Sequence, residues 1–169
     1  AGGTLYNQAS HFVDLLLFFM EKPKSVYRMM GKKKLDIEIE DTGTITSEFE
    51  NGAFGVLNYT VAATNKNCEG SLTLVFSKGT IKIGGEYLDK IDYFQVEGVD
   101  SPESVVSPLE PETYGFYRES MSNLFSDIVK NFNDSSCQGN LVRGEEAIEG
   151  VRFMEAAMES ARTKKIVSL

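Results

Sequence analysis

Two consecutive β-hairpins with alternating apolar residues restrict the fold of this chain more than any other feature. The first joins TGTITSEFE to AFGVLNYTVAA through Asn51-Gly52, a dipeptide typical of tight turns because both residues tolerate positive φ. The second joins SLTLVF to TIKIGG through residues 77–79. Its alternating apolar residues are Leu72, Leu74, Phe76, Ile81 and Ile83. Buried parallel strands would be continuously apolar, so one-sided alternation predicts an antiparallel sheet with helices packed on one face.

Three other segments have the apolar spacing of amphipathic helices with one buried face. The expected buried residues of the first helix are Phe12, Leu15, Leu16 and Phe19. Those of the second are Tyr117, Met121, Leu124, Phe125, Ile128 and Phe132. Those of the third, residues 145–162, are Ala147, Val151, Met154, Met158 and Ala161. Further strands are predicted at SVYRMM, IDYFQVEG and KIVSL, and a surface loop at the proline-rich residues 99–112. A block of strands followed by helices indicates an α+β fold with a largely antiparallel open sheet.

Length, charge and cysteine content exclude several classes of protein. A chain of 169 residues fits a single domain over residues 1–169. Its net charge of -8 offers no basic surface, so neither nucleic acid nor an acidic membrane is an expected partner. The run LLLFFM is far shorter than the roughly 20 residues of a membrane span, so we expect a cytoplasmic location. Cys68 and Cys137 are predicted to be free thiols, and no cluster of Cys and His indicates a metal site.

The single histidine, His11, lies on the first predicted helix, one turn after Asn7 and one turn before Asp14. That spacing aligns three polar side chains along one edge of a helix. The residues alone leave structural alternatives open, since His11 can be a hydrogen-bonded structural residue and Asn7 can cap the helix. The preceding Gly2-Gly3 pair suits either a flexible chain end or a backbone that approaches a ligand closely.

Other kinds of catalytic site have weaker support in the sequence. Ser10 and His11 are adjacent, so their side chains diverge on a regular helix and form no nucleophile–base pair. Asp36, Glu38 and Glu40 alternate as on the solvent-facing side of a strand. Neither GxGxxG nor GxxxxGK[ST] occurs, so the sequence has no phosphate-binding loop. A redox enzyme that contains this chain therefore needs another domain.

The stretch GGTLYNQASHFVDLLLFF, residues 2–19, resembles the start of the C-terminal domain of the Gfo/Idh/MocA oxidoreductases, where a glycine pair precedes an N-x-x-x-H or D-x-x-x-H helix. DTGTITSEFENGAFGVLNYTV, EGSLTLVFSKGTIKIGGEYLDKI and GEEAIEGVRFMEAAMESARTKKIVSL are similar to later parts of that domain, in the same order. The segment EGSLTLVFSKGTIKIGG resembles the branch that oxidises UDP-N-acetyl-glucosaminuronic acid at C3 in bacterial surface-polysaccharide synthesis. The resemblance implies the substrate-binding and oligomerisation half of a two-domain enzyme, with an N-terminal Rossmann domain expected outside this sequence.

The same resemblance implies roles for residues of the first helix. His11 is expected to be the acid/base beside the reacting sugar hydroxyl, because an imidazole titrates near neutral pH. Asn7, which stands where many members have Asp, is expected to orient the sugar or a lysine of the Rossmann domain. Tyr6 and Gln8 are expected in the sugar pocket. The cofactor is expected to be NAD or NADP, bound mainly by the missing N-terminal domain, so this chain alone is expected to be inactive.

Two further positions are candidates for contacts with an anionic group or a uridine, namely Asn65 and Lys66. Their structural alternative is a polar hairpin loop. The predicted second helix departs from the family, because Met121 and Phe125 stand where relatives often have a His and a Tyr. The contacts of that helix with a sugar are therefore not carried over to this sequence.

A different class of function is also consistent with the sequence. A one-sided sheet leaves an open face, and a second copy of the same chain commonly covers such a face. The chain can thus be a non-catalytic association module that forms dimers or tetramers, with Leu57, Tyr59 and Val61 on one candidate interface. A third alternative is the same domain from a dehydrogenase of free sugars or inositol.

Overall fold

The computed structural model of the chain divides into two compact units. One is formed by Ala1–Ala62 with Val142–Leu169, and the other by Ala63–Leu141. The residues that the structure describes are 3–66, 68–85, 88, 90–102, 115–133, 141–142 and 144–169, without the side chains of 115–120. Residues 103–112 of the predicted surface loop, Gly2 and Cys137 lie outside that set.

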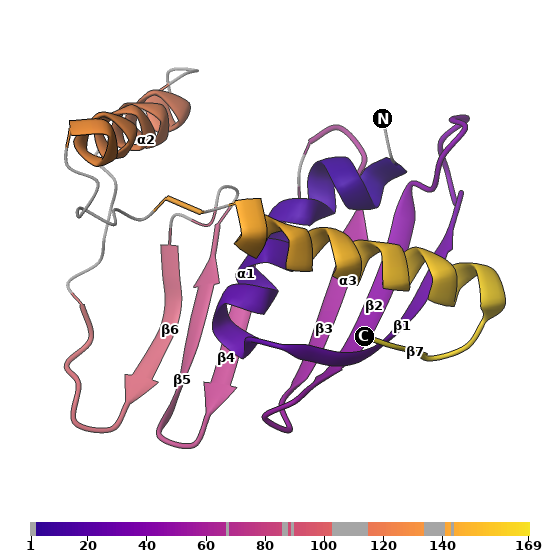
Figure 1. Cartoon of the computed structure of the whole chain (residues 1–169), viewed down its shortest axis with the longest axis horizontal. Helices are drawn as coiled ribbons and strands as arrows, with labels where there is room; N and C mark the ends of the chain where they lie inside the picture. The colour runs from indigo at the N-terminus through magenta and orange to yellow at the C-terminus, as the bar shows by residue number, and fades with distance from the viewer. Residues whose placement is uncertain are drawn as a thin grey trace. The chain divides into compact units, whose positions relative to one another are not determined.

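The first unit is a four-stranded antiparallel sheet of order β3-β2-β1-β7 with helices across one face (Figure 1). Its strands are β1 (Pro23–Gly31), β2 (Thr42–Phe49), β3 (Phe54–Thr60) and β7 (Val167–Ser168). Its helical segments are η1 (Leu5–Ala9), which is a π-helical turn, α1 (Ser10–Met20) and α3 (Gly144–Thr163). The predicted α+β class, the antiparallel pairing and the closing strand are confirmed.

The second unit contains a separate antiparallel sheet of order β4-β5-β6 and one long helix (Figure 1). Its elements are β4 (Leu72–Phe76), β5 (Gly79–Gly84), β6 (Lys90–Val96) and α2 (Gly115–Asn133). The strand predicted at IDYFQVEG and the helix predicted after the proline-rich segment are therefore present. The prediction of a buried face on that helix is wrong for its described side chains, because Met121, Leu124, Phe125, Ile128 and Phe132 are all exposed. The predicted strands divide between two sheets.

Both predicted hairpins form, with turns that differ slightly from expectation. At the first turn the Gly52 N–H donates to the Phe49 carbonyl at 3.0 Å, and the Phe49 N–H donates to the Ala53 carbonyl at 3.0 Å. Only Gly52 of the dipeptide has a positive φ, 84°. This pattern is a three-residue loop in which a residue in the left-handed region follows the turn. In the second hairpin Phe76 pairs with Gly79, so only residues 77–78 form the turn.

The prediction of the buried face of the first helix is confirmed for Leu16 and wrong for Phe19, while Phe12 and Leu15 are half-buried. The buried residues are Leu5, Ala9, Val13 and Leu16, whereas Phe19 is 42% exposed. In the run LLLFFM every position is apolar, so the spacing of apolar residues does not define which face is buried. The smaller Ala9 and Val13 lie on the side that packs in the core, and Phe18 and Phe19 contact each other edge to face instead.

The buried face of α3 also differs from the prediction. Phe153, Met154, Ala157, Ser160 and Ala161 are buried, while Ala147 is exposed and Val151 is 45% exposed. The spacing of apolar residues gives no indication that Ser160 is buried, because Ser160 is polar and its hydroxyl is hydrogen-bonded inside the protein. Its Oγ accepts from the Arg28 N–H at 3.1 Å and donates to the Lys165 carbonyl at 2.6 Å. The apolar spacing is therefore confirmed for Met154 and Ala161, which are buried, and for Met158, which packs against the core, and it is wrong for the first part of the helix.

The helices cover the sheet face that carries Leu57 and Tyr59. Leu57 is buried and Tyr59 is half-buried against the core, so the prediction of an interface on this face is wrong. The opposite, open face carries Phe54, Val56 and Met29, which are 79%, 64% and 55% exposed. No helix in the described part of the chain is long and apolar enough to cross a membrane.

Candidate functional site

The exposed side of η1 and α1 brings together four residues that the sequence singled out. Asn7, Gln8 and His11 are exposed, and Tyr6 is half-buried beside them. The opposite side of the same helical segment is fixed by Leu5 and other apolar residues in the core. Core packing therefore turns the polar residues toward the surface, where they can meet a ligand.

Asn7 lies inside the π-helical turn and does not cap a helix. The residues at the cap positions are Thr4 for η1 and Ala9 for α1, and neither makes a side-chain capping hydrogen bond. The Asn7 carbonyl accepts a 3.4 Å hydrogen bond from Ser10 Oγ, which leaves the amide side chain available. Single π-helical turns within α-helices occur frequently at functional sites.

His11 makes no hydrogen bond or ion pair to any residue in the described part of the chain. The alternative of an internally hydrogen-bonded structural histidine therefore lacks a partner there. An exposed imidazole near an exposed amide can accept a proton from, or donate one to, a bound hydroxyl. The pair has the composition of a site for a polar, hydroxylated ligand.

Tyr6 completes this helix face with a phenol that stays protonated at neutral pH. Partial burial raises the pKa of Tyr6, and the negative charge of Glu155 raises it further. The positive charge of Arg28 acts in the opposite direction. The Tyr6 hydroxyl is thus a hydrogen-bond donor and acceptor rather than a base.

Beneath the helix face lies a buried polar cluster that the sequence analysis missed, formed by Arg28, Glu40 and Tyr59. Arg28 Nη2 donates to Glu40 Oε1 at 2.6 Å, and Arg28 Nε donates to the Tyr59 hydroxyl at 2.9 Å. Arg28 is fully buried and Glu40 is 8% exposed. Burial raises the pKa of Tyr59, against the opposing effect of the Arg28 charge. The Arg28 guanidinium also contacts the Met158 sulfur.

The expectation of a solvent-facing strand at Asp36, Glu38 and Glu40 is wrong. These residues lie in the loop between β1 and β2, where Asp36 and Glu38 are exposed and Glu40 points into the buried cluster. The alternating sequence suggested a strand, but the pairing of Glu40 with Arg28 determines its conformation. A charge that is paired at 2.6 Å in the interior cannot be recognised from alternation alone.

The neighbouring Asp41 fixes the rest of this loop. Its carboxylate accepts from the backbone N–H groups of Leu35 and Lys34, each at 2.8 Å, and of Lys33 at 2.9 Å. These hydrogen bonds, that of Leu35 above all, hold the pKa of Asp41 well below its usual range although burial acts in the opposite direction. The basic run at residues 32–34 is thus an ordered turn.

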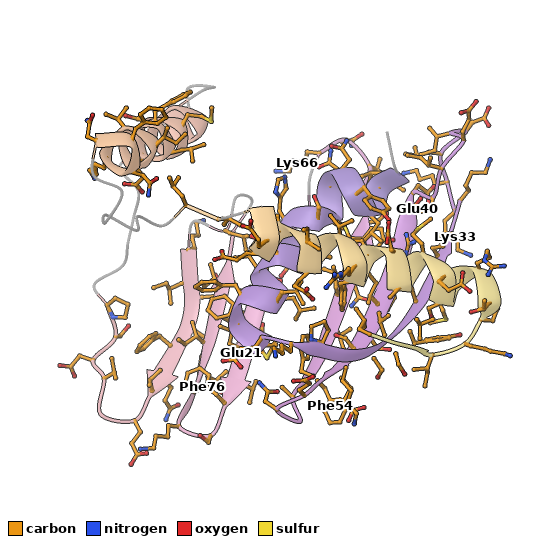
Figure 2. The ribbon with its side chains drawn as sticks, viewed as in Figure 1. Glu21, Lys33, Glu40, Phe54, Lys66 and Phe76 are labelled. Atoms are coloured by element: carbon orange, nitrogen blue, oxygen red, sulfur yellow. The ribbon has the colours of Figure 1, made fainter. Side chains whose placement is uncertain are left out.

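Asn65 and Lys66 belong to the second unit, whereas Tyr6, Asn7, Gln8 and His11 belong to the first. Both are exposed, and Asn65 has a φ of 72° (Lys66 is labelled in Figure 2). They lie in the connection between β3 and β4, which are strands of different sheets, so this loop is not a hairpin. Within one unit, the structure brings together the four candidate residues of the first helical segment.

No metal site is found in the described part of the chain, where no three His, Cys, Asp or Glu side chains gather. Cys68 is exposed and forms no disulfide. The site thus consists of an imidazole, a phenol and two amides on one helix, above a buried ion pair. This composition suits proton transfer and hydrogen bonding to an uncharged polar group.

The chain has the fold of the C-terminal α/β domain of an oxidoreductase. The family model with the description "Oxidoreductase family, C-terminal alpha/beta domain" matches residues 1–169. The chain therefore belongs to the Gfo/Idh/MocA oxidoreductase family. A sequence comparison with curated proteins gives no significant match.

Several solved structures have the same fold. The WlbA dehydrogenase from Bordetella pertussis, in complex with NADH and UDP-GlcNAcA, is 28% identical over 99% of this chain and 45% of its own, with a TM-score of 0.77. The WlbA dehydrogenase from Chromobacterium violaceum, also in complex with NADH and UDP-GlcNAcA, is 29% identical over 99% of this chain and 46% of its own, with a TM-score of 0.74. An aldose-aldose oxidoreductase from Caulobacter crescentus complexed with glycerol shares the fold at 17% identity, covering 99% of this chain and 48% of its own, with a TM-score of 0.75. The chain spans less than half the length of each of these proteins.

Proposed function

We propose that this chain is the substrate-binding and oligomerisation domain of an NAD(P)-dependent dehydrogenase of sugars or nucleotide sugars. The observation that carries the proposal is the exposed helix face with Asn7 and His11, whose side chains have no partner in the described part of the chain. Both WlbA enzymes are complexed with NADH and UDP-GlcNAcA at 28% and 29% identity, which favours a UDP-sugar uronate oxidised at C3. We further propose that both units, residues 1–169, act as one domain.

In this proposal His11 accepts the proton of the reacting hydroxyl. Oxidation of a carbinol removes a hydride from carbon and a proton from oxygen, and the cofactor takes the hydride. Hydride leaves more readily as the proton is withdrawn, so a neutral imidazole beside the hydroxyl lowers the barrier. Asn7 and Gln8 orient the sugar by hydrogen bonds, and Tyr6 donates from its protonated hydroxyl.

The residues of this chain do not fit a dinucleotide. The sequence has no glycine-rich turn between a strand and a helix, which is the usual cradle of a pyrophosphate. We therefore place NAD or NADP on a separate N-terminal domain and expect this chain alone to be inactive. Saturable micromolar binding of NAD to the 169-residue chain would overturn that expectation.

Asn65 and Lys66 remain candidates for contacts with the uridine or an anionic group of the substrate. Their exposure leaves them accessible, and Lys66 supplies a positive charge. As in the branch that the sequence resembles, we place the reaction in the cytoplasm and in surface-polysaccharide synthesis.

A second function, homo-association, is favoured by the open face of the first sheet. Phe54 and Val56 on that face are 79% and 64% exposed, and a second copy of the chain would remove them from water. Figure 2 shows Phe54 at the hairpin end of the sheet. Val56→Lys is expected to weaken self-association in sedimentation velocity, whereas Val75→Lys, at a residue 75% exposed in the second unit, is not. Equal sedimentation of both variants and the unmodified protein would argue against this interface.

The proposed function is tested by NAD(P)H-linked turnover of the intact oxidoreductase. The substrates are UDP-sugars, UDP-sugar uronates, free hexoses and inositols, each with the unmodified protein, His11→Asn and Lys22→Gln. Lys22 is an exposed residue just beyond α1 and serves as the control. We expect turnover of a UDP-sugar uronate that falls about a hundredfold in His11→Asn and is unchanged in Lys22→Gln. No turnover with any substrate, in a protein that folds and self-associates, would favour the association module.

A further inference from the structure

We propose that Glu40, held by Arg28, is a positioning residue for the helix that carries Asn7 and His11. The inference rests on the proposed function, because it concerns the same helix face. Glu40 touches neither Asn7 nor His11 in this proposal, and acts through the backbone at the start of η1.

The start of η1 depends on Glu40 for its hydrogen bonds. The first N–H groups of a helix have no partner within the helix, and η1 lacks a side-chain cap of its own. The Leu5 N–H donates to Glu40 Oε1 at 3.1 Å, and the Thr4 hydroxyl donates to the Glu40 carbonyl. Figure 2 labels Glu40 beside this helical segment. A single loop residue, distant in sequence, therefore replaces the missing cap.

The Glu40 carboxylate is itself held rigidly. Arg28 Nη2 donates to the same Oε1 that accepts from Leu5, and Arg28 Nε and Nη2 both donate to the Tyr59 hydroxyl. Arg28 is completely buried, so no solvent competes for the charge. Charge-assisted hydrogen bonds of this kind are shorter and stronger than neutral ones. The sheet thus sets the position of the carboxylate, and the carboxylate sets the position of the helix.

Gly3 shows how closely the carboxylate lies against the chain. It has a φ of 93°, in the region that favours glycine, and a Cβ added there would lie 2.7 Å from Glu40 Oε2. The close approach is therefore between Gly3 and Glu40. The positive φ of Gly3 thus serves packing against a carboxylate of the same chain.

The exposed residues have no other support. The side chains of Asn7 and His11 make no hydrogen bond or ion pair with another described residue, so the position of the helix backbone largely determines where they lie. Leu5 and Ala9 anchor that backbone in the core, and Glu40 anchors its first turn. A displacement of about 1 Å far from the reacting atoms can cost about a hundredfold in rate. Loss of the Glu40 anchor is therefore expected to reduce kcat.

The test compares Glu40→Leu, Glu40→Gln and Ser160→Ala in the intact oxidoreductase. Ser160 is the matched control, because it is buried and its hydroxyl hydrogen-bonds the Arg28 N–H and the Lys165 carbonyl rather than η1. Glu40→Leu is expected to lower kcat about a hundredfold, and Glu40→Gln, which keeps an acceptor for the Leu5 N–H, to recover part of that loss. Ser160→Ala is expected to lower the melting temperature with little change in kcat. Combined with His11→Asn, Glu40→Leu should cause no additional loss, because both changes disable the same group.

Hydrogen exchange separates this inference from the proposed function. Amides of residues 4–9 are expected to exchange faster in both Glu40 variants than in Ser160→Ala, whether or not the protein turns over a sugar. Faster exchange without sugar turnover in any variant would overturn the proposed function and support the anchoring of η1. Turnover that requires His11 but is the same in Glu40→Leu and Ser160→Ala would overturn the positioning role.

Discussion

The two compact units of the chain differ in how far their side chains are buried. Every buried apolar residue that the structure describes lies in the first unit, as do the buried polar residues Arg28, Glu40, Asp41 and Ser160. In the second unit no described side chain is buried, and Phe132 on α2 is 91% exposed. The first unit therefore has its own core, which fixes the helix with His11. The second unit has alternating strands and an amphipathic helix without a comparable core among its described residues.

The same sequence pattern therefore has two structural outcomes in this chain. Both units contain a predicted hairpin, and both hairpins form. Ile45 of β2 is fully buried, whereas Ile81 of β5 is only half-buried. Alternation predicts which residues share a face, and the elements that pack on that face decide how much water they lose.

The largest expected difference in stability is between two Phe→Ala substitutions, one in each unit. Phe153→Ala removes a fully buried ring from α3 and is expected to lower the free energy of unfolding by about 3–5 kcal/mol. Phe132→Ala on α2 is expected to change it by less than about 0.5 kcal/mol, since that ring is exposed. Urea unfolding followed by circular dichroism measures both. Equal destabilisation would mean that the second unit buries Phe132 against a surface of its own.

The next effect depends on pH and concerns the Asp41 turn of the first unit. The pKa of Asp41 is lowered in the folded protein, so the folded state binds fewer protons than the unfolded state in acid. Its stabilisation is complete above about pH 4, the usual pKa of Asp, and is lost as the pH falls below that value. Asp41→Asn should therefore lower the melting temperature at pH 7 and have a diminishing effect toward pH 2. A difference that stays constant over this range would contradict the assigned hydrogen bonds.

A smaller effect is expected from Ile→Val in an inner strand of each sheet. Ile45→Val in β2 is expected to cost about 0.5–1.5 kcal/mol, because the removed methylene group leaves a space in a closed core. Ile81→Val in β5 should cost less, since its site is half-open to water. The comparison requires only the two unfolding curves. A larger loss of unfolding free energy for Ile81→Val than for Ile45→Val would contradict the difference in burial between the two units.

The smallest effect is expected at exposed ion pairs, where the two units should not differ. Lys24 pairs with Glu48 at 2.7 Å in the first unit, and Lys82 pairs with Asp92 at 3.6 Å in the second. Exposed pairs contribute about 0–1 kcal/mol, so Lys24→Ala and Lys82→Ala are each expected near the lower end of that range. Thermal unfolding at low and high salt provides the measurement. A cost of several kcal/mol at either site would show that the pair is shielded from solvent.

Local sequence patterns predicted much of the fold. The Asn51-Gly52 turn, the alternation around Ile81 and the helical spacing before Ala161 each depend on neighbours within a few residues, and each element is present. Which helix face is buried was predicted less well. In α1 the apolar residues surround the helix, and in α3 a hydrogen-bonded Ser160 occupies a core position, so apolar spacing alone did not define the buried face.

Of the candidate site, the sequence predicted the exposed residues and missed their support. Asn7 and His11 lie four positions apart, and a helix brings them to one side. Arg28 and Glu40 are twelve positions apart across a loop, and their pairing depends on the tertiary fold. A charged residue in a polar segment is normally taken as exposed, so no local pattern indicated the buried pair.

In the proposed function, the exposed face of η1 and α1 binds the substrate with His11 beside the reacting hydroxyl. A crystal structure of the intact oxidoreductase with NADH and UDP-N-acetyl-glucosaminuronic acid tests it most directly. We predict a His11 ring nitrogen within about 3.2 Å of the reacting hydroxyl, with Asn7 in contact with the sugar. A sugar bound by other elements, with His11 facing solvent, would contradict the account.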